Sequence, residues 1–551
     1  MAHDTFAGYL DQWARETPDT VWLRDRRGDD FTEWTWSEAH AEIAAMAACL
    51  EERFGSSGVG MAILSRNRAH WFMADFAIIA SGNMTIPVFT TLPGPTAEYV
   101  FDFSETKVLF LGETENWGDV REILSEDVAI ITLPGVECDR PHTTWQDFVS
   151  DAQGSAPNYV CKPDDIVSLV FTSGTTGVPK GVIQTHNTNI IPMDRFDAAF
   201  SVRDNPRLLS YLPLSHIAER QLVEGHSVLR CGTVTFNEGL PFILRDLQYA
   251  KPHFFFGPPR VWEQLQQIVI GQFGSTEAVE QALADDKAAT GKKVLDMLGL
   301  GEVDYCLTAA APTPPALIKW YGEFGLMLLE GFGQTEAMGL IANSKQDRRI
   351  GSIGKPVPGV EFKLSEENEL LVKTDGLSPG YYKMPEKTAE LHQDGWLHTG
   401  DKARVDEDGY IFITGRVKDY FKTIHGKFVA PTPIENVYAD NDHTEQICLL
   451  GRGYSKTVVV AVLSEIAQGK EKSEMESALR DQVMTTNKTV DKHARIGAVI
   501  VSTEPWTIAN EVLTPTMKIR REQVEARFGE QAERMARSAA EQGEVLVEWA
   551  E

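Results

Sequence analysis

The stretch Phe171-Thr-Ser-Gly-Thr-Thr-Gly-Val-Pro-Lys-Gly-Val182 carries the strongest signal in this sequence of 551 residues. Seven of its twelve residues are glycine, serine or threonine, and it continues a strand-like apolar run over residues 166–171. Glycines let backbone amides approach an anion, hydroxyl groups add donors, and Lys180 adds a positive charge. The stretch therefore predicts a polyphosphate-binding loop, with a polar surface turn as the alternative. It is not a Walker A loop, because Pro179 stands at the second glycine and no Gly-Lys-Ser/Thr follows.

The overall charge sets a condition for such a site. Lysines and arginines number 52 and acidic residues number 80, which gives a net charge of −28. So acidic a surface repels phosphate backbones and anionic lipid, and we therefore expect no nucleic-acid partner and no electrostatic membrane docking. An anionic substrate must instead be bound by a local basic or amide-lined site.

The cysteines and the apolar runs bear on location. Six scattered cysteines without a C-x-x-C pair fit a reducing compartment and argue against a disulfide framework or a structural zinc site. The first residues show no secretory signal. The longest apolar run, 71–80, is about half of the ~20 residues that cross a bilayer, and Asp75 interrupts it. We expect a cytoplasmic protein without a transmembrane segment, and the sequence leaves its oligomeric state open.

The pattern along the chain indicates several units. The length suggests roughly three, at ~100–200 residues each. Up to residue 350, helical and strand-like segments alternate, which is typical of an α/β fold. We expect a helix over 37–54 with Ser37 as its N-cap, and a charged helical stretch over 275–298. The expected strands are 61–65, 85–89, 107–111 and 166–171.

From about residue 351 the sequence pattern changes to short strand-like segments separated by turn residues, which predicts a β-rich subdomain over 351–416. A new mixed unit then runs to the end of the chain. Its last residues, from 519 on, are rich in Glu and Arg and read as a solvated helical tail.

The loop over 171–182 resembles the phosphate loop of the adenylate-forming superfamily, which includes acyl-CoA synthetases, peptide-synthetase adenylation domains and luciferases. Matches in the superfamily's order extend over 34–521. They are Gly331-Phe-Gly-Gln-Thr-Glu336, a Gly-Tyr-x-x-x-Pro-Glu-x-Thr pattern matched by Tyr381 through Glu390, Gly395-Trp-Leu-His-Thr-Gly-Asp401, Gly415-Arg-Val-Lys-Asp419 and Leu-Thr-Pro-Thr-Met-Lys518. The resemblance implies a large N-terminal domain over 1–416, built of doubly wound α/β subdomains plus the β-rich one. A hinge at Lys418 would join it to a small mobile α+β C-terminal domain over 417–551.

The resemblance also implies an ATP site with magnesium. Thr175 and Glu336 would hold Mg²⁺, which suits a hydroxyl and a hard carboxylate oxygen; a helix cap is the alternative for the Thr-Glu pair. Asp401, with Arg416 as its partner, would bind the ribose hydroxyls, and a turn aspartate is the alternative. The expected ATP-binding residues are Thr172, Ser173, Gly174, Thr175, Thr176, Gly177, Lys180, Ala310, Phe332, Gly333, Gln334, Thr335, Asp401 and Arg416.

Two positions depart from the superfamily pattern. Phe332 stands where a tyrosine is usual, so its ring can stack on adenine while the phenolic hydroxyl is lost. Ala309-Ala-Ala-Pro312 replaces a glycine-containing adenine loop, which restricts the backbone around Ala310.

Lys518, Glu336 and His216 are the expected catalytic residues. A lysine brought in by a mobile domain would stabilise the charge that builds when a carboxylate attacks the α-phosphate of ATP; a solvated lysine is the alternative. Tyr211-Leu-Pro-Leu-Ser-His216 and Gly257-Pro-Pro-Arg-Val-Trp-Glu263 resemble the long-chain acyl-CoA synthetase branch. By analogy, His216 would line the carboxylate end of the acyl site, with a structural histidine as the alternative.

The implied function is a two-step ligase. It would convert a carboxylic acid, here a medium- or long-chain fatty acid, and Mg·ATP to an acyl-adenylate, then transfer the acyl group to coenzyme A. Lys422 and Gly426 lie in a stretch that resembles the loop lining the pantetheine tunnel. Two alternatives stay open: another acceptor, such as a carrier-protein thiol, or a catalytically silent nucleotide- or acyl-binding protein. Phe254-Phe-Phe256 could serve an acyl tunnel, although a buried strand is favoured.

Overall fold

The structure is a computed structural model that describes residues 3–28, 30–152, 154–172, 178–508, 510–514 and 518–550. It divides into two compact units. Unit 1 comprises Met1–Phe362 and Val372–Leu397, and unit 2 comprises Lys363–Leu371 and His398–Glu551. Three strands contain residues of both units, because the chain passes between the units within them: β17 (Glu361–Leu364), β18 (Glu369–Lys373) and β20 (Trp396–Val405). The domain limits expected at 351 and 416 stay predictions.

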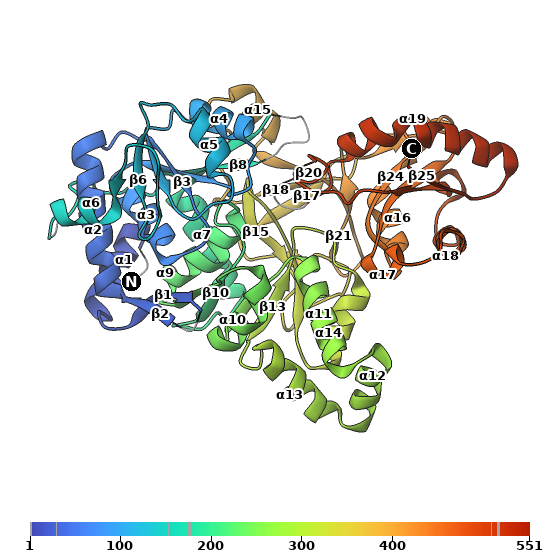
Figure 1. Cartoon of the computed structure of the whole chain (residues 1–551), viewed down its shortest axis with the longest axis horizontal. Coiled ribbons are helices and arrows are strands. Elements are labelled where there is room, and N and C mark those ends of the chain that lie inside the picture. Colours follow the sequence, from blue (N-terminus) through green and yellow to red (C-terminus); the bar gives the residue numbers. More distant parts are fainter. Residues whose placement is uncertain are drawn as a thin grey trace. The chain divides into compact units, whose positions relative to one another are not determined.

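The first sheet of unit 1 has seven strands in the order β7-β6-β5-β3-β4-β8-β9 (Figure 1). All neighbours are parallel except β8 and β9, which are antiparallel. The strands expected over 61–65, 85–89, 107–111 and 166–171 are confirmed as members of this sheet. Their bounds are β3 (Gly60–Leu64), β4 (Met84–Val88), β5 (Val108–Leu111), β6 (Ala129–Thr132), β7 (Thr143–Thr144), β8 (Ile166–Thr172) and β9 (Lys180–Thr185).

Two further sheets lie in unit 1. One has the order β10-β11-β1-β2 and the other β12-β13-β14-β15-β16. Phe254, Phe255 and Phe256 form β12 and are buried, which confirms the strand interpretation of this run. The bounds are β1 (Val21–Arg27), β2 (Asp30–Thr35), β10 (Arg207–Ser210), β11 (Thr233–Phe236), β12 (Phe254–Phe256), β13 (Tyr305–Thr308), β14 (Leu328–Gln334), β15 (Ala337–Ala342) and β16 (Lys355–Pro356). Strand β19 (His392–Gln393) instead pairs with β20, in the sheet of order β17-β18-β20-β19.

Helices pack on these sheets, and the apolar core lies between the layers. Trp22 of β1 and Trp36 of α2, both fully buried, stack with ring centroids 4.2 Å apart. The helical elements of unit 1 are α1 (Phe6–Glu16), α2 (Trp36–Phe54), α3 (Ala69–Ala80), α4 (Gly94–Phe103), α5 (Trp117–Ile123), α6 (Trp145–Asp151), α7 (His186–Phe200), α8 (Ile217–Glu219), the π-helix η1 (Arg220–Gly225), α9 (His226–Leu229), η2 (Leu240–Phe242), α10 (Ile243–Ala250), α11 (Pro259–Phe273), α12 (Thr276–Asp285), α13 (Lys287–Leu298), α14 (Pro315–Glu323) and α15 (Pro385–Leu391).

Two expectations about these helices are wrong in detail. The N-cap of α2 is Thr35, whose side chain forms a capping box with Glu38, while Ser37 donates its hydroxyl to the carbonyl of Pro18. The charged stretch over 275–298 is two helices, α12 and α13. They separate at Asp286, because its carboxylate caps α13 by accepting a hydrogen bond from an amide of the first turn.

Unit 2 is built around the mixed sheet β24-β25-β26-β27. The tail expected to be a solvated helix is wrong in two respects: α19 buries one face, and β27 follows it and pairs in parallel with β26. The elements are β21 (Ile411–Arg416), β22 (Phe421–Lys422), β23 (Phe428–Val429), α16 (Pro431–Tyr438), β24 (Thr444–Leu450), β25 (Thr457–Leu463), α17 (Glu465–Gln468), α18 (Lys472–Thr486), η3 (Lys492–Ala494), β26 (Ile496–Ser502), α19 (Arg521–Gln542) and β27 (Leu546–Trp549).

The expected α/β fold, with a large N-terminal part and a smaller C-terminal part, is confirmed. None of the helices in the described part of the chain combines the length and apolarity that a membrane crossing requires.

Glu330 is a buried acid in β14. Its Oε2 accepts the N–H of Gly351 at 2.7 Å. Burial raises the pKa of Glu330 from 4.5 to about 7, although this hydrogen bond opposes the shift. The folded state thus keeps a proton that the unfolded state releases, and the stability this provides is lost as pH rises from about 4.5 to about 7.

We predict that Glu330→Gln makes the protein more stable than the wild type at pH 8, by about 2–3 kcal/mol, with little difference near pH 4.5. The amide cannot ionise, yet its oxygen still accepts the N–H of Gly351. Thermal unfolding of both proteins at the two pH values measures the effect. Exposed Glu361→Gln is the control, and a gain for Glu330→Gln that is equal at both pH values contradicts the prediction.

Candidate active site

The predicted phosphate loop joins β8 to β9. Thr172 ends β8 and pairs with Lys180, the first residue of β9. The loop starts at the carboxyl end of β8, which is parallel to β4, and ligands of open α/β sheets bind at such ends. The other expected ligands lie outside the described residues, namely Ser173, Gly174, Thr175, Thr176 and Gly177.

Tyr381 connects two of the predicted site residues. Its hydroxyl donates to Oε1 of Glu336 at 2.7 Å, and Tyr381 is buried, with only 8% of its surface exposed. The Nζ of Lys180 lies 4.6 Å from the centroid of the Tyr381 ring, which is a cation–π contact. The structure therefore brings Lys180 and Glu336 to the same tyrosine.

Hydrogen bonds fix the segments that carry these three side chains. Strand β9 and residues 378–382 are joined by two main-chain bonds, of 2.8 and 3.0 Å. The N–H of Ser378 donates to the carbonyl of Glu336 at 2.9 Å, and the side chain of Gln184 donates to the carbonyl of Thr335 at 2.8 Å. Three separate parts of the chain thus meet beside the phosphate loop.

Thr335 and Glu336 form the turn between β14 and β15, where Gln334 pairs with Ala337. The alternative of a helix cap is therefore not realised. In the described ranges, no group of three or more His, Cys, Asp or Glu side chains is arranged to hold a metal by itself. A single carboxylate fits a magnesium ion that arrives with a nucleotide and takes its remaining ligands from phosphate and water.

The predicted adenine-binding residues lie at one edge of the third sheet of unit 1. Strands β13 and β14 are parallel, with Thr308 opposite Glu330. Ala310 and Phe332 each stand two residues further on: Ala310 follows the end of β13, while Phe332 lies within β14 and pairs with Ile341 of β15. Ala310 has φ +71°, in the left-handed region that favours glycine. An alanine at this position therefore holds a less favourable backbone conformation than a glycine would.

His216 is the N-cap of α8, and its Nδ1 accepts the N–H of Ala218 at 3.2 Å. This is the structural role that the sequence left as the alternative. The half-buried imidazole's predicted place at an acyl site stays a prediction.

A buried polar network behind His216 was not predicted. The carboxyl of Glu219 accepts the N–H of Tyr211 at 3.0 Å, and burial raises its pKa to about 8. Next to it, Arg220 donates to both carboxylate oxygens of Asp75, at 2.7 and 2.8 Å. These bonds anchor the segment 211–216 to the helices behind it. The sequence signal was present, since Glu219 and Arg220 follow His216 closely, between the apolar pairs 217–218 and 222–223.

In unit 2, Asp401 and Arg416 lie opposite each other on antiparallel strands β20 and β21. The Nε of Arg416 is 2.8 Å from Oδ1 of Asp401, which is buried while the arginine is about half exposed. The partnership of these two residues is thus present. Binding of a ribose by Asp401 stays a prediction.

The predicted hinge and coenzyme A residues are also in unit 2. Lys418 is exposed in a turn after β21. The Nζ of Lys422 lies 4.7 Å from the ring centroid of Phe428 across the β22–β23 hairpin. Gly426, in the turn of that hairpin, has φ +70°, a backbone conformation that favours glycine. This requirement is separate from its predicted contact with coenzyme A.

Lys518 is exposed in unit 2, in a segment over 518–520 that pairs with residues 512–514; together these two segments form the Lys518 hairpin. Its N–H donates to Oγ1 of Thr514 at 3.0 Å, and its carbonyl accepts the N–H of Thr514 at 2.8 Å. Lys518, Asp401 and Arg416 therefore belong to one unit, while Lys180 and Glu336 belong to the other.

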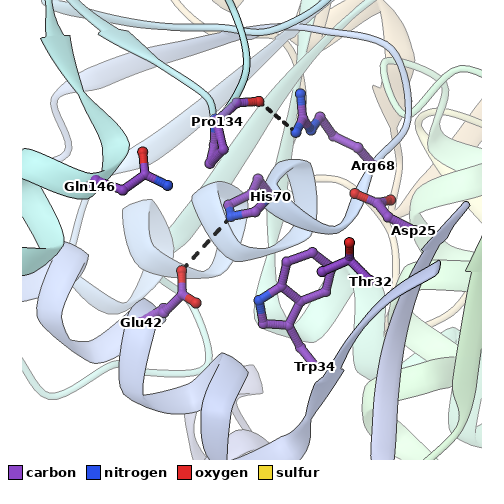
Figure 2. Close-up of a pocket in the computed structure, with 8 residues that line it drawn as sticks. All are labelled: Asp25, Thr32, Trp34, Glu42, Arg68, His70, Pro134 and Gln146. Atoms are coloured by element: carbon purple, nitrogen blue, oxygen red, sulfur yellow. Dashed lines mark hydrogen bonds and ion pairs between the residues drawn. The ribbon is translucent and has the colours of Figure 1, made fainter. Parts of the chain in front are cut away.

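Unit 1 also contains a pocket of about 320 Å³ that is lined by none of the predicted site residues (Figure 2). In it, Arg68 donates to the carbonyl of Pro134 at 2.8 Å, and Nε2 of His70 lies 3.8 Å from a carboxylate oxygen of Glu42. Burial, aided by Arg68, lowers the pKa of His70 to about 3, so this imidazole is neutral at physiological pH.

We predict that Tyr381→Phe lowers the free energy of unfolding of unit 1 by about 1–2 kcal/mol, because Glu336 loses a buried donor. Denaturant unfolding measures the change. The control is Tyr382→Phe, at the neighbouring tyrosine, whose ring packs on Phe103. Equal effects of the two substitutions would show that the Tyr381 hydroxyl contributes nothing specific.

Comparison with known proteins finds relatives in sequence and in fold. The long-chain-fatty-acid–CoA ligase FadD15 of Mycobacterium bovis is 28% identical over 587 residues, covering 96% of this chain and 97% of the relative. The peroxisomal long chain acyl-CoA synthetase 6 of Arabidopsis thaliana is 28% identical, over 91% of this chain and 81% of the relative. The adenylation domain of a carboxylate reductase from Mycobacterium chelonae shares the fold, with a TM-score of 0.83 at 19% identity and coverage of 96% and 91%.

Two family models account for most of the sequence. The model described as AMP-binding enzyme matches residues 10–382, and the model described as AMP-binding enzyme C-terminal domain matches residues 418–539. The resemblance to adenylate-forming enzymes read from the sequence is confirmed, and the chain belongs to the AMP-binding enzyme family.

Proposed function

We propose that the protein is an AMP-forming acid–thiol ligase that converts a fatty acid to its coenzyme A thioester. The observation that carries the proposal is the contact of Lys180 and Glu336 with one buried tyrosine beside the phosphate loop. The names of the two sequence relatives, both acyl-CoA-forming enzymes, support the choice of acid and acceptor. The resemblance of the His216 motif to the long-chain branch supports a medium- or long-chain acid.

The first step forms an acyl-adenylate. A carboxylate oxygen of the acid attacks the α-phosphorus of ATP, and the bond from that phosphorus to the pyrophosphate oxygen breaks. Lys180 offers a positive charge to the phosphates, and Glu336 would hold magnesium against them. Magnesium, when bound, offsets the negative charge of the phosphates. Together these groups overcome the repulsion expected from a chain of net charge −28.

Residues of unit 2 complete this step. Asp401, oriented by Arg416, accepts hydrogen bonds from the ribose hydroxyls. Lys518 stabilises the charge on the α-phosphate and on the leaving pyrophosphate, an electrostatic contribution made in the transition state. A rotation about the expected hinge, Lys418, would then exchange Lys518 for the coenzyme A residues Lys422 and Gly426.

The second step transfers the acyl group. The thiol of coenzyme A, losing its proton, attacks the acyl carbonyl carbon, and AMP leaves with the electrons of the anhydride bond.

The six cysteines of the chain are unpaired, which supports a cytoplasmic location for this reaction.

A carrier-protein thiol is the second candidate acceptor, which the sequence leaves open. A silent binding protein is disfavoured, because binding alone does not need the combination of Lys180, Glu336, Asp401 and Lys518.

Pyrophosphate release with acids from acetate to palmitate, with and without coenzyme A, tests the proposal. We expect release that depends on the acid, is stimulated by coenzyme A and peaks at one chain length. Acid-dependent release that ignores coenzyme A indicates another acceptor. No release with any of the acids contradicts the ligase.

We predict that Lys518→Gln slows adenylation by about 10²–10³-fold and leaves transfer from preformed acyl-adenylate to coenzyme A within about twofold. The two half-reactions are measured separately. The control is Lys488→Gln, at an exposed lysine of the same unit. Equal losses in both half-reactions contradict the assignment of Lys518 to the first step.

A further inference from the structure

The hairpin that carries Lys518 ends at a buried ion pair. Helix α19 begins at Arg521, three residues after Lys518. Before it, the N–H of Arg520 donates to the carbonyl of Val512 at 2.8 Å, and an isolated bridge joins Leu513 to Ile519. The main chain from Lys518 to Arg520 is therefore paired with residues 512–514, and Arg521 follows directly as the first residue of α19.

The side chain of Arg521 reaches two other elements of unit 2. Its Nη2 donates to Oε1 of Glu435 in α16 at 2.8 Å, and its Nη1 donates to the carbonyl of Leu449 in β24 at 2.5 Å. The N–H of Leu449 donates to the same Oε1 of Glu435 at 2.7 Å. These three bonds form a closed ring that joins α16, β24 and the start of α19.

The ring is charged although it is buried. The side chains of Arg521 and Glu435 are only 19% and 15% exposed. Burial disfavours the guanidinium charge, but Glu435, together with Cys448 and Asp419, more than offsets this, and the pKa of Arg521 is raised overall. Breaking such a pair leaves an uncompensated buried charge, so the geometry of the ring is strongly enforced.

We propose that Arg521 and Glu435 are positioning residues for Lys518: their buried ion pair fixes the hairpin from which this lysine reaches the α-phosphate. The inference rests on the adenylation role proposed for Lys518. Both residues bond to unit 2's own elements and do not touch reacting atoms. A lysine side chain is long and flexible, so the direction of its main chain decides where its charge can stand, and small misplacements cost large factors in rate.

The effect is selective for the first half-reaction. Residues 422–431, expected to serve coenzyme A, lead into α16, which keeps its own apolar anchors in buried Ile434 and Tyr438. The Lys518 hairpin depends more directly on Arg521, which starts the next helix. Breaking the pair thus disturbs the lysine more than the coenzyme A loop.

Arg521→Lys is the main test, because lysine keeps the charge but lacks the planar fork whose two nitrogens bond to Glu435 and Leu449. We expect adenylation to fall about tenfold and transfer from preformed acyl-adenylate to stay within twofold. Glu435→Gln should show the same selectivity. The matched control is Arg534→Lys in the same helix, at an exposed ion pair with Glu548. Losses that are equal in both half-reactions, or equal in the control, would overturn the proposal.

A double-mutant cycle separates positioning from general destabilisation. In a Lys518→Gln background, Arg521→Lys should change adenylation by less than twofold, because no lysine is left to position. Multiplicative losses would overturn the inference alone. A Lys518→Gln protein with wild-type adenylation would instead overturn the role of Lys518, and this inference with it.

Hydrogen exchange gives a readout that does not depend on activity. Arg521→Lys should speed exchange at the amides of Lys518 and Arg520, while the amides of β25 in the same unit stay protected. Unchanged exchange in the hairpin would overturn the proposal, whatever the rates show.

Discussion

The contact of Lys180 and Glu336 with Tyr381 is the interaction on which the site in unit 1 depends. The three side chains come from a strand start, a hairpin turn and a loop that are far apart in sequence. Both charged side chains are long, and both residues are only partly buried at the end of a strand or in a turn. The buried tyrosine gives both of them one reference point, and main-chain bonds between the three segments keep that point in place.

The charge of the chain explains why such a reference point matters. At −28 the protein repels ATP at long range, so binding must come from a few groups that act at close quarters. The face of the Tyr381 ring attracts the ammonium of Lys180 electrostatically, and this contact holds the positive charge beside the loop that is expected to bind phosphate. Glu336, bonded to the tyrosine through one oxygen, adds to the negative charge near the loop. It therefore fits a place where a cation accompanies the substrate.

The sequence predicted the fold class and most of the strands in the first sheet, because parallel buried strands are nearly continuous apolar runs between glycine-containing turns. It missed features that depend on distant partners. Strand β27 is only the four residues Leu546–Trp549, and its pairing with the distant β26 makes it a strand. The Thr35–Glu38 capping box, by contrast, was readable as Thr-x-x-Glu. In the site, motif positions such as Glu336 were found, while the bond from Tyr381 to Glu336 follows from tertiary contacts that no local pattern encodes.

A ligase of the proposed kind asks unit 2 to present two different elements to the substrate in turn. Each element must be rigid by itself, because a domain rotation can position the lysine or the coenzyme A loop only if that element is held in a fixed conformation within the domain. Apolar packing often stabilises a core as well as a buried ion pair does, so stability alone is a weak reason for Arg521 and Glu435. Bonds with fixed direction between α16, β24 and α19 supply what apolar contacts lack, a defined orientation of the chain next to Lys518. The charged ring is therefore better explained by the precision that the lysine needs than by the stability of the unit.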